Sequence, residues 1–404
     1  MFCYFERLES SEFMNLYFDH AATTKVCDEA LTAIENAALV TYGNPSSMHY
    51  IGMKAEDLVE EARKFMSRQL FVSDKEIYFT SGGTESNNLA VQGVAKAYIR
   101  DGKHIITTKI EHPSVGSTFK QLEDEGFDVT YIDVDSKGYV NLEQLEESIR
   151  KDTTLVSIMQ VNNEIGCIQN LEAIGTLIKS VNSRTLLHVD GVQGFMKLPI
   201  SIKRAKIDLY SASSHKIYGP KGSGLLYIKQ GTKIRPLQFG GSQQKGIRPG
   251  TENVPGIAGF YKAAESISKD MKDNYIKVLA LKEYFLENLA LKLPKWGSHS
   301  IPSNGNYESE ISSPYIINFR TISIKGEVVL HALEDYKISV STGSACSSKK
   351  LNISHVLKAL NLEDVESDRA VRISFSHHQT KEDIDELFRA LIEIDAMFGK
   401  FIKR

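Results

Sequence analysis

The sequence predicts an α/β protein with a mainly parallel sheet and a smaller α+β domain after it. Between about residues 75 and 230, short apolar runs rich in β-branched and aromatic residues alternate with helical patterns. From about residue 256 the pattern changes to a long helical segment rich in Ala, Lys, Glu and Leu. A chain of 404 residues is long enough for two domains. We therefore expect an N-terminal extension over residues 1–15, a large domain over 16–255 and a small domain over 256–404.

Seven apolar runs predict the strands of the large domain. Helical patterns separate them, beginning at Glu85, after His112 and near Leu142 to Ile149. Strands that alternate with helices in this way form a parallel sheet covered on both faces. In chain order the runs are EIYFT (76–80), HIITT (104–108), FDVTYI (127–132), TLVSIM (154–159), LLHVD (186–190), IDLYS (207–211) and GLLYI (224–228).

The small domain has a less regular pattern. A helical segment over residues 256–293 is followed by a polar, irregular stretch, residues 297–313, and then by the strand YIINF at 315–319. A helix is expected near Glu327 to Asp335. The segment after Thr380 is strongly helical, with apolar residues at helical spacing: Ile384, Leu387, Leu391 and Ile394.

Composition and charge exclude several classes of protein. With 42% hydrophobic and 25% charged residues, the chain has the composition of a globular protein. Its formal charge of -3 argues against a nucleic-acid or membrane-surface binder, because those proteins need a clustered basic face. No run approaches the roughly 18 to 20 apolar residues that span a bilayer.

The cysteines and the N-terminal residues indicate a reducing compartment. Cys3, Cys27, Cys167 and Cys346 are widely scattered and form no CxxC pair, so we expect free thiols and no metal site. Charged residues interrupt the first fourteen positions, which therefore lack the apolar core of a signal peptide. We expect a cytoplasmic protein.

Five polar loops follow predicted strands and are expected to meet at one edge of the sheet. In parallel α/β sheets, ligands bind beyond the carboxyl ends of the strands. The loops are SGGT (81–84), EHPS (111–114), VNNEIG (161–166), VDGVQ (189–193) and SSHK (213–216). Lys216 ends the last of them, and Asp190 lies on the neighbouring one. This layout suits a lysine that forms a Schiff base, with a carboxylate facing it.

Each candidate residue has an ordinary alternative when it is taken singly. Lys216 fits a solvated loop, and Asp190 fits a helix N-cap. His112 fits a hydrogen-bonded structural histidine, and Arg372 fits a surface salt bridge. A buried free thiol is the commonest fate of a cysteine such as Cys346. Only the combination of these residues points to a shared function.

The combination resembles a known family. Ten motifs, in the family's order and over nearly the whole chain, resemble cysteine desulfurases of the NifS and IscS type, which are fold type I, class V aminotransferase-like pyridoxal phosphate enzymes. The motifs are YFDHAATT (17–24), YGNPSSMH (42–49), FTSGGTESNN (79–88), IEHPSV (110–115), VSIMQVNNEIG (156–166), HVDGVQ (188–193), SASSHKIYGPKG (211–222), RPGTEN (248–253), STGSACSS (341–348) and VRISF (371–375).

The resemblance implies that residues 16–255 form the domain that binds pyridoxal phosphate. Lys216 matches the Schiff-base lysine, which can later act as a base at the substrate Cα. Asp190 would keep the pyridine nitrogen protonated, which makes the ring an electron sink. His112 would stack on the ring. Gln193 and Asn163 would contact the ring hydroxyl, and Asn163 would also contact the substrate carboxylate.

The phosphate and the substrate have their own matches. Gly83 and Thr84 open a helix, where backbone N–H groups and the helix dipole favour an anion. By resemblance, Arg372 anchors the substrate carboxylate, a task that suits the guanidinium fork. The resemblance places four further residues at the phosphate, the last of them supplied by the second subunit of a homodimer: Ser213, Ser214, His215 and Thr251.

Cys346 is the residue that distinguishes the reaction. It lies in STGSACSSKK, a polar segment typical of an exposed loop, with Lys349 and Lys350 nearby to favour the thiolate. By resemblance, Cys346 attacks the sulfur of a bound L-cysteine and becomes a persulfide while L-alanine is formed. The sulfur would then pass to an acceptor protein, such as an iron–sulfur scaffold or a tRNA-thiolation factor. Cys3, Cys27 and Cys167 lack this setting.

Two other functions remain open at this point. A selenocysteine lyase, or another class V lyase, can share the lysine and the aspartate, although the STGSAC loop favours a desulfurase. A catalytically idle protein that binds a sulfur carrier is disfavoured, because Lys216, Asp190, His112 and Cys346 are all intact. Family chains tend to begin a few residues before YFD, so we expect Met14 to be the natural start.

Overall fold

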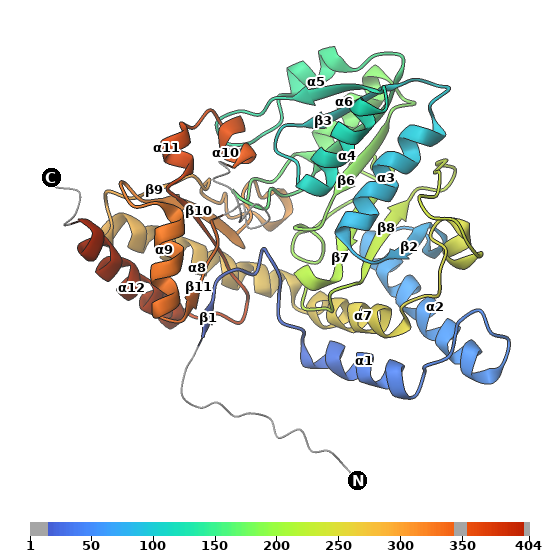
Figure 1. The fold of residues 1–404 in the computed structure, drawn as a ribbon, viewed down its shortest axis with the longest axis horizontal. Coiled ribbons are helices and arrows are strands. Elements are labelled where there is room, and N and C mark those ends of the chain that lie inside the picture. The colour runs from blue at the N-terminus through green and yellow to red at the C-terminus, as the bar shows by residue number, and fades with distance from the viewer. Residues whose placement is uncertain (1–14, 343–353, 400–404) are drawn as a thin grey trace, which may run out of the picture.

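The fold is known from a computed structural model that describes residues 15–342 and 354–399 (Figure 1). The expectations for Met14 and Cys346 lie outside the described residues. The remaining predicted site residues all fall within them.

A seven-stranded sheet forms the centre of the large domain, as predicted. The strand order is β2-β8-β7-β6-β5-β3-β4. All neighbours are parallel except β8, which runs antiparallel to both β2 and β7. The strands are β2 (Ile77–Thr80), β3 (His104–Thr108), β4 (Asp128–Ile132), β5 (Thr153–Met159), β6 (Leu186–Asp190), β7 (Leu209–Ser213) and β8 (Gly224–Ile228).

Helices cover both faces of this sheet, because alternate side chains of each strand point to opposite sides. Ile105 and Leu155 pack on one face with α3 (Gly83–Ala97) and α4 (Pro113–Asp124). Their neighbours Ile106 and Val156 pack on the other face. The helices on that second face are α2 (Tyr50–Leu70), α5 (Leu142–Ser148), α6 (Leu171–Val181) and α7 (Val254–Ser268), and α1 (Asp28–Leu39) packs outside α7.

The small domain has an antiparallel sheet of order β12-β10-β9 and its own core. Phe285, Phe319 and Phe388 meet in that core. Its helices are α8 (Met271–Lys292), α9 (Gly326–Asp335), α10 (His355–Ala359), α11 (Asp364–Ser367) and α12 (Lys381–Gly399). Its strands are β9 (Gly297–Ser298), β10 (Ile316–Arg320), β11 (Ile338–Ser339) and β12 (Ala370–Ser374).

Two connections join the cores. The helical segment expected over 256–293 consists of two helices that separate at Lys269 and Asp270. The first of them, α7, packs in the core of the large domain, and α8 packs in that of the small domain. The second connection is the N-terminal segment: β1 (Leu16–Tyr17) pairs in parallel with β11 of the small domain before the chain reaches α1. The domain limits at 15 and 255 stay predictions.

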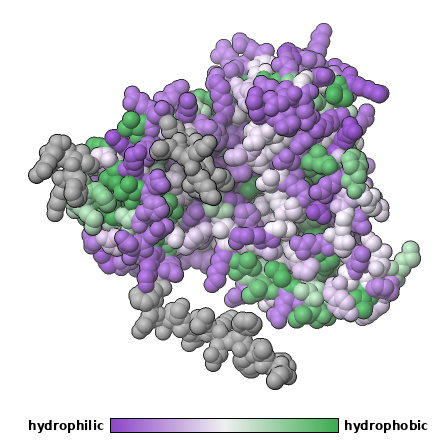
Figure 2. Space-filling model, viewed as in Figure 1, coloured by the Kyte–Doolittle hydropathy of each residue, from purple (hydrophilic) through white to green (hydrophobic). Residues whose placement is uncertain are grey.

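The surface is largely polar on the face shown in Figure 2, with hydrophobic residues along its lower edge, where α1 lies. Large exposed apolar side chains occur at the end of α1, in the next loop and at the start of α2: Leu39, Val40, Tyr42, Met48, Tyr50 and Met53. Among the described helices, none combines the length and the apolar character needed to cross a membrane.

Candidate active site

The five predicted loops do meet at one edge of the sheet. Strands β2, β3, β5, β6 and β7 all point the same way, so their carboxyl ends lie together. Asp190 is the last residue of β6, and Lys216 ends a 3-10 turn directly after β7. His112 caps α4 after β3, Gly83 is the first residue of α3 after β2, and Asn163 follows β5.

Lys216 is held by backbone carbonyls from the N-terminal segment. Its Nζ donates to the carbonyl oxygens of Ala21 at 2.5 Å and Ala22 at 2.7 Å. Gln193 is buried, and its Nε2 also donates to the Ala21 oxygen, at 2.9 Å. The segment before α1 therefore brings the lysine and the glutamine to the same point.

His215 is tied to the same segment. Its carbonyl oxygen accepts hydrogen bonds from both the amide and the hydroxyl of Thr24, each at 2.9 Å. Its Nδ1 lies 3.2 Å from Thr23 Oγ1. Burial, aided by the charge of Lys216, lowers the pKa of His215 to about 4, so the imidazole is neutral at physiological pH.

Asp190 is buried and fixed through both carboxylate oxygens. Its Oδ2 accepts from Asn87 Nδ2 at 2.7 Å, and its Oδ1 accepts from the Val192 amide at 3.0 Å. The amide of Asn87, on α3, also donates to Ser114 Oγ at 2.9 Å. The carboxylate therefore has one orientation at the end of its strand.

His112 caps the helix that follows it. Its Nδ1 accepts from the backbone amide of Ser114 at 3.2 Å and lies 2.8 Å from Ser114 Oγ. Burial lowers the pKa of His112; the charge of Lys216 acts in the same direction, and Asp190 opposes it. A neutral ring whose Nδ1 accepts hydrogen bonds carries its proton on Nε2.

The residues at the start of α3 fit a phosphate group. Gly82 has a φ of 151°, which favours glycine. A Cβ on Gly83 would lie 2.7 Å from Val192 Cγ2, so any larger residue there would force neighbouring atoms to shift. The hydroxyls of Ser213 and Ser214 are buried and have no hydrogen-bond partner among the described residues. Ser213 adjoins Gly82 and Gly83 at the start of α3, and an unpaired hydroxyl beside the positive end of a 15-residue helix suits an anion. Ser214 Oγ instead faces Gly219.

Arg372 is buried and only partly paired. Its Nη2 lies 2.6 Å from Asp19 Oδ1, and its Nη1 donates to the Asn163 carbonyl oxygen at 2.9 Å. Its Nε is buried and lacks a partner within the described residues. A carboxylate can accept a hydrogen bond from such a donor. The backbone of Arg372 also exchanges two hydrogen bonds with Ser341, five residues before Cys346.

Two of the predicted phosphate residues are exposed. Thr251 is exposed in a loop whose Arg248 pairs with Glu85 of α3 at 2.9 Å. Thr84 is also exposed, on the first turn of α3. Of the other cysteines, Cys167 is buried in a hydrophobic cluster, and burial raises its pKa to about 12.

Sequence reasoning missed three residues of the site. Asp19, Asn87 and Ser114 contact predicted site residues and were assigned no role. All three lie within motifs that carry the resemblance: YFDHAATT, FTSGGTESNN and IEHPSV. Membership of those motifs was the only sign in the sequence that these three residues belong to the site. Most of the residues that they contact are distant in sequence, so the contacts themselves could not be predicted.

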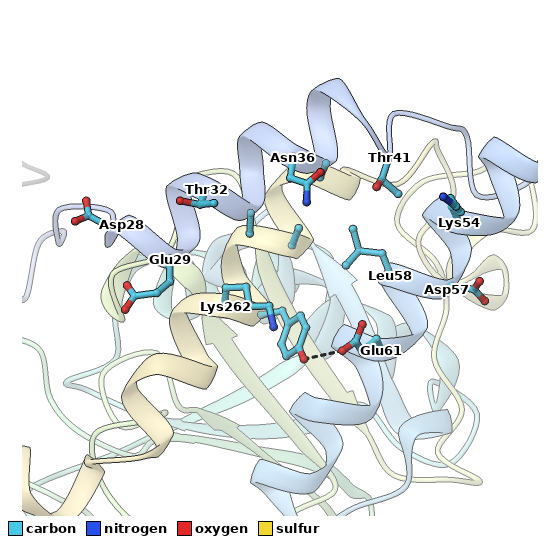
Figure 3. A pocket seen from close by; sticks show the side chains of 14 residues that line it. Asp28, Glu29, Thr32, Asn36, Thr41, Lys54, Asp57, Leu58, Glu61 and Lys262 are labelled. Atoms are coloured by element: carbon cyan, nitrogen blue, oxygen red, sulfur yellow. Dashed lines mark hydrogen bonds between the residues drawn. The ribbon is translucent and has the colours of Figure 1, made fainter. Parts of the chain in front are cut away.

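A separate pocket of about 750 Å³ lies between α1, α2 and α7 (Figure 3). Acidic side chains of Asp28, Glu29, Asp57 and Glu61 line it, and Tyr261 donates a hydrogen bond to Glu61. It contains none of the predicted site residues, so it is distinct from the cluster around Lys216.

Comparison with known proteins decides the family. A family model described as aminotransferase class-V matches residues 16–387. The chain belongs to this family. A NifS/IcsS protein homolog of Lactobacillus delbrueckii is 43% identical over 95% of this chain and 98% of its own length. The cysteine desulfurase IscS of Dictyoglomus turgidum is 40% identical over 92% of each chain.

Solved structures of similar proteins agree in fold. A NifS-like protein superposes with a TM-score of 0.88 at 37% identity and covers 95% of this chain and all of its own. A structure described as SspA in complex with cysteine has a TM-score of 0.77 at 32% identity, over 90% of this chain. The predicted family, fold and pyridoxal phosphate dependence are thereby confirmed.

Proposed function

We propose that this member of the family is a cysteine desulfurase that converts L-cysteine to L-alanine and takes the sulfur as a persulfide on Cys346. The observation that carries the proposal is the meeting of Lys216, Asp190 and His112 at one edge of the sheet, where Arg372 of β12 reaches the Asn163 carbonyl. The chain is also 40% identical to a named cysteine desulfurase.

The residues of the edge suit pyridoxal phosphate. Lys216 would bind its aldehyde carbon, and Asp190 would pair with its ring nitrogen. His112 would lie against the ring, with Gln193 and Asn163 at the ring hydroxyl. When bound, the cofactor supplies an electron sink for the charge left at the substrate Cα. The phosphate would be held by Gly83, Thr84, Ser213, Ser214, His215 and, from the second subunit, Thr251.

Arg372 and Lys216 would orient the substrate and move its protons. The Nε of Arg372, which has no partner among the residues that the structure describes, offers a donor to the substrate carboxylate. Asp19 and the Asn163 carbonyl already orient the rest of the guanidinium. Lys216, released when the substrate amine takes its place, would accept the Cα proton. His112 would enter this cycle neutral, with a proton to donate from Nε2.

Cys346 would take the sulfur atom. Its thiolate attacks the substrate sulfur, so that an S–S bond forms and the C–S bond breaks. The electron pair of the C–S bond stays with Cβ, which takes a proton and becomes the methyl group of alanine. The persulfide would pass to an acceptor protein, such as an iron–sulfur scaffold or a tRNA-thiolation factor.

A homodimer and a cytoplasmic location complete the proposal. The exposed apolar side chains around the end of α1 support a surface that is covered in solution, since large exposed apolar patches mark interfaces. Thr251 is also exposed, as a residue that serves a second subunit must be. Met48→Glu combined with Tyr50→Glu should halve the mass measured by sedimentation, whereas Leu291→Glu, at an exposed site on α8, should leave it unchanged.

The activity is tested with cysteine as substrate and a reductant present. The purified protein should be yellow, and Lys216→Ala should lose the absorbance band. Cys346→Ser should keep the colour and lose sulfide release, while Cys27→Ser should behave as wild type. Sulfide release by Cys346→Ser at the wild-type rate would show that the nucleophile is wrong. Faster turnover of selenocysteine than of cysteine would favour the lyase.

A further inference from the structure

A chain of buried hydrogen bonds joins Asp190 to His112 through two residues with no assigned role. Asn87 Nδ2 lies 2.7 Å from Asp190 Oδ2 and 2.9 Å from Ser114 Oγ, and Ser114 Oγ lies 2.8 Å from His112 Nδ1. Asn87 is 1% exposed and Ser114 is 8% exposed. The two residues come from α3 and α4, which pack side by side on the sheet (Figure 1).

The chemistry of the groups fixes the direction of each hydrogen bond. An ionised carboxylate only accepts, so the atom of Asn87 that faces Asp190 is the amide nitrogen. The same nitrogen faces Ser114 Oγ, which therefore accepts as well. The hydroxyl hydrogen of Ser114 is then free to point at His112 Nδ1, which the Ser114 amide also approaches, at 3.2 Å. Two donors thus converge on Nδ1.

A purely structural role accounts poorly for Asn87. Its Oδ1 is buried and has no hydrogen-bond partner within the described part of the chain. Leaving a buried acceptor unpaired is unfavourable. The amide nitrogen, by contrast, makes both of its hydrogen bonds to site residues. The two hydrogen bonds that the Asn87 amide nitrogen donates, to Asp190 and to Ser114, therefore explain the position of this side chain.

We propose that Asn87 and Ser114 are positioning residues that fix the orientation of the Asp190 carboxylate and hold the His112 proton on Nε2. The proposal rests on the proposed function, because it assigns Asp190 to the ring nitrogen and His112 to the ring face. One asparagine then aligns two of the groups proposed to contact the cofactor ring, and Ser114 transmits its effect to the histidine.

The first test reads the histidine directly, in the protein without cofactor. In ¹⁵N-histidine-labelled protein, the His112 signals, identified by their loss in His112→Gln, should show an Nε2–H tautomer. The charged or titratable groups that face this ring are Asp190, Lys216 and His355, and all are kept in the variants. Ser114→Ala removes a donor to Nδ1, and Asn87→Ala frees the serine oxygen to accept from a protonated ring. Both should raise the pKa of His112.

The control is Asn288→Ala, which removes another buried asparagine, on α8 in the small domain. It should leave the pKa of His112 as in wild type, and its thermal unfolding gives the stability cost of such a change. A wild-type Nδ1–H tautomer, or an unchanged His112 pKa in both Asn87→Ala and Ser114→Ala, would overturn the proposal.

The second test uses the protein with cofactor. Asn87→Ala should keep its pyridoxal phosphate and lose about tenfold or more in kcat, because small misplacements of reacting groups are costly, with little change in the KM for cysteine. Unchanged kcat would contradict the role of Asn87. A wild-type protein that binds no cofactor would instead contradict the proposed function and leave the histidine measurement valid.

Discussion

The Arg372 guanidinium lies 2.6 Å from the Asp19 carboxylate, across 353 positions of sequence. The arginine side chain is 3% exposed and that of the aspartate 17%. In a pair this buried, the carboxylate compensates a guanidinium charge whose burial alone would be unfavourable. The pair also fixes the direction in which the guanidinium points. The proposed substrate anchor is therefore oriented before any substrate arrives.

Arg372→Lys tests whether the guanidinium group of Arg372 anchors the substrate carboxylate. A lysine ammonium cannot reach Asp19, the Asn163 carbonyl and a carboxylate with the same geometry. We expect the KM for cysteine to rise at least about tenfold, which corresponds to ~1.4 kcal/mol, with cofactor absorbance retained. The matched control is Arg389→Lys, on the exposed side of α12, where the arginine pairs only with Glu386 among the partners seen. An unchanged KM in Arg372→Lys would exclude the anchor role.

Asp19→Asn tests the ion pair. Removing one partner of a buried pair leaves an uncompensated charge, and we expect a loss of ~2–4 kcal/mol in the free energy of unfolding, measured with urea. Arg372→Gln should restore part of that loss when it is combined with Asp19→Asn, since no charge then stays unpaired. Additive losses in the double variant would show that the two residues do not interact.

Glu111 predicts how stability depends on pH. It is buried; Thr108 Oγ1 and the Met159 amide donate to one carboxyl oxygen, and the other oxygen has no partner among the described residues. Burial raises its pKa to about 8. Between about pH 4.5 and 8 the unfolded chain ionises this group and the folded chain does not, so its contribution to stability is full below pH 4.5 and is lost as the pH rises.

Glu111→Gln should remove that dependence. The amide cannot ionise, so the variant should gain stability over wild type at pH 8 by an amount of order a few kcal/mol and gain much less at pH 5. Urea unfolding at the two pH values measures the difference. An equal effect of the substitution on stability at pH 5 and at pH 8 would mean that Glu111 is ionised in the folded protein.

Gly83→Ala tests the phosphate site. A Cβ there would lie 2.7 Å from Val192 Cγ2, so either the Val192 side chain or the first turn of α3 must shift. We expect a lower affinity for pyridoxal phosphate, by about tenfold or more, measured by equilibrium dialysis. Gly116→Ala, on α4 with open space around the added carbon, should keep the affinity and stabilise the protein by about 0.4–1 kcal/mol. Equal affinities in both variants would remove α3 from the phosphate site.

The strands and the edge that carries the site could be predicted from local sequence. Runs such as LLHVD and GLLYI are mostly apolar and lack the strict alternation of a half-exposed strand, which is the pattern of a strand buried on both faces. Parallel strands place their following loops together, so the meeting of Lys216 and Asp190 also followed. The separation of α7 from α8 could not be predicted in this way, because Ser268, Lys269 and Asp270 include no glycine or proline that would mark the end of a helix.

The supporting contacts of the site depend on distant partners. Asp19 reads as an ordinary residue after a short strand, and only the folded chain brings it to Arg372. Asn87 lies in the middle of a helical pattern, where its face toward Asp190 is fixed by the packing of α3 on the sheet. Such pairings are set by tertiary structure, which a single sequence does not reveal.

The segment over residues 16–22 ties the two domains to each other. Leu16 and Tyr17 pair with β11 of the small domain, and the carbonyls of Ala21 and Ala22 receive the amine of Lys216 in the large domain. Proteolytic removal of residues before position 24 would therefore take a strand partner and the core side chains of Phe18 and Ala21 from one domain. It would also take two hydrogen-bond acceptors from the proposed Schiff-base lysine of the other.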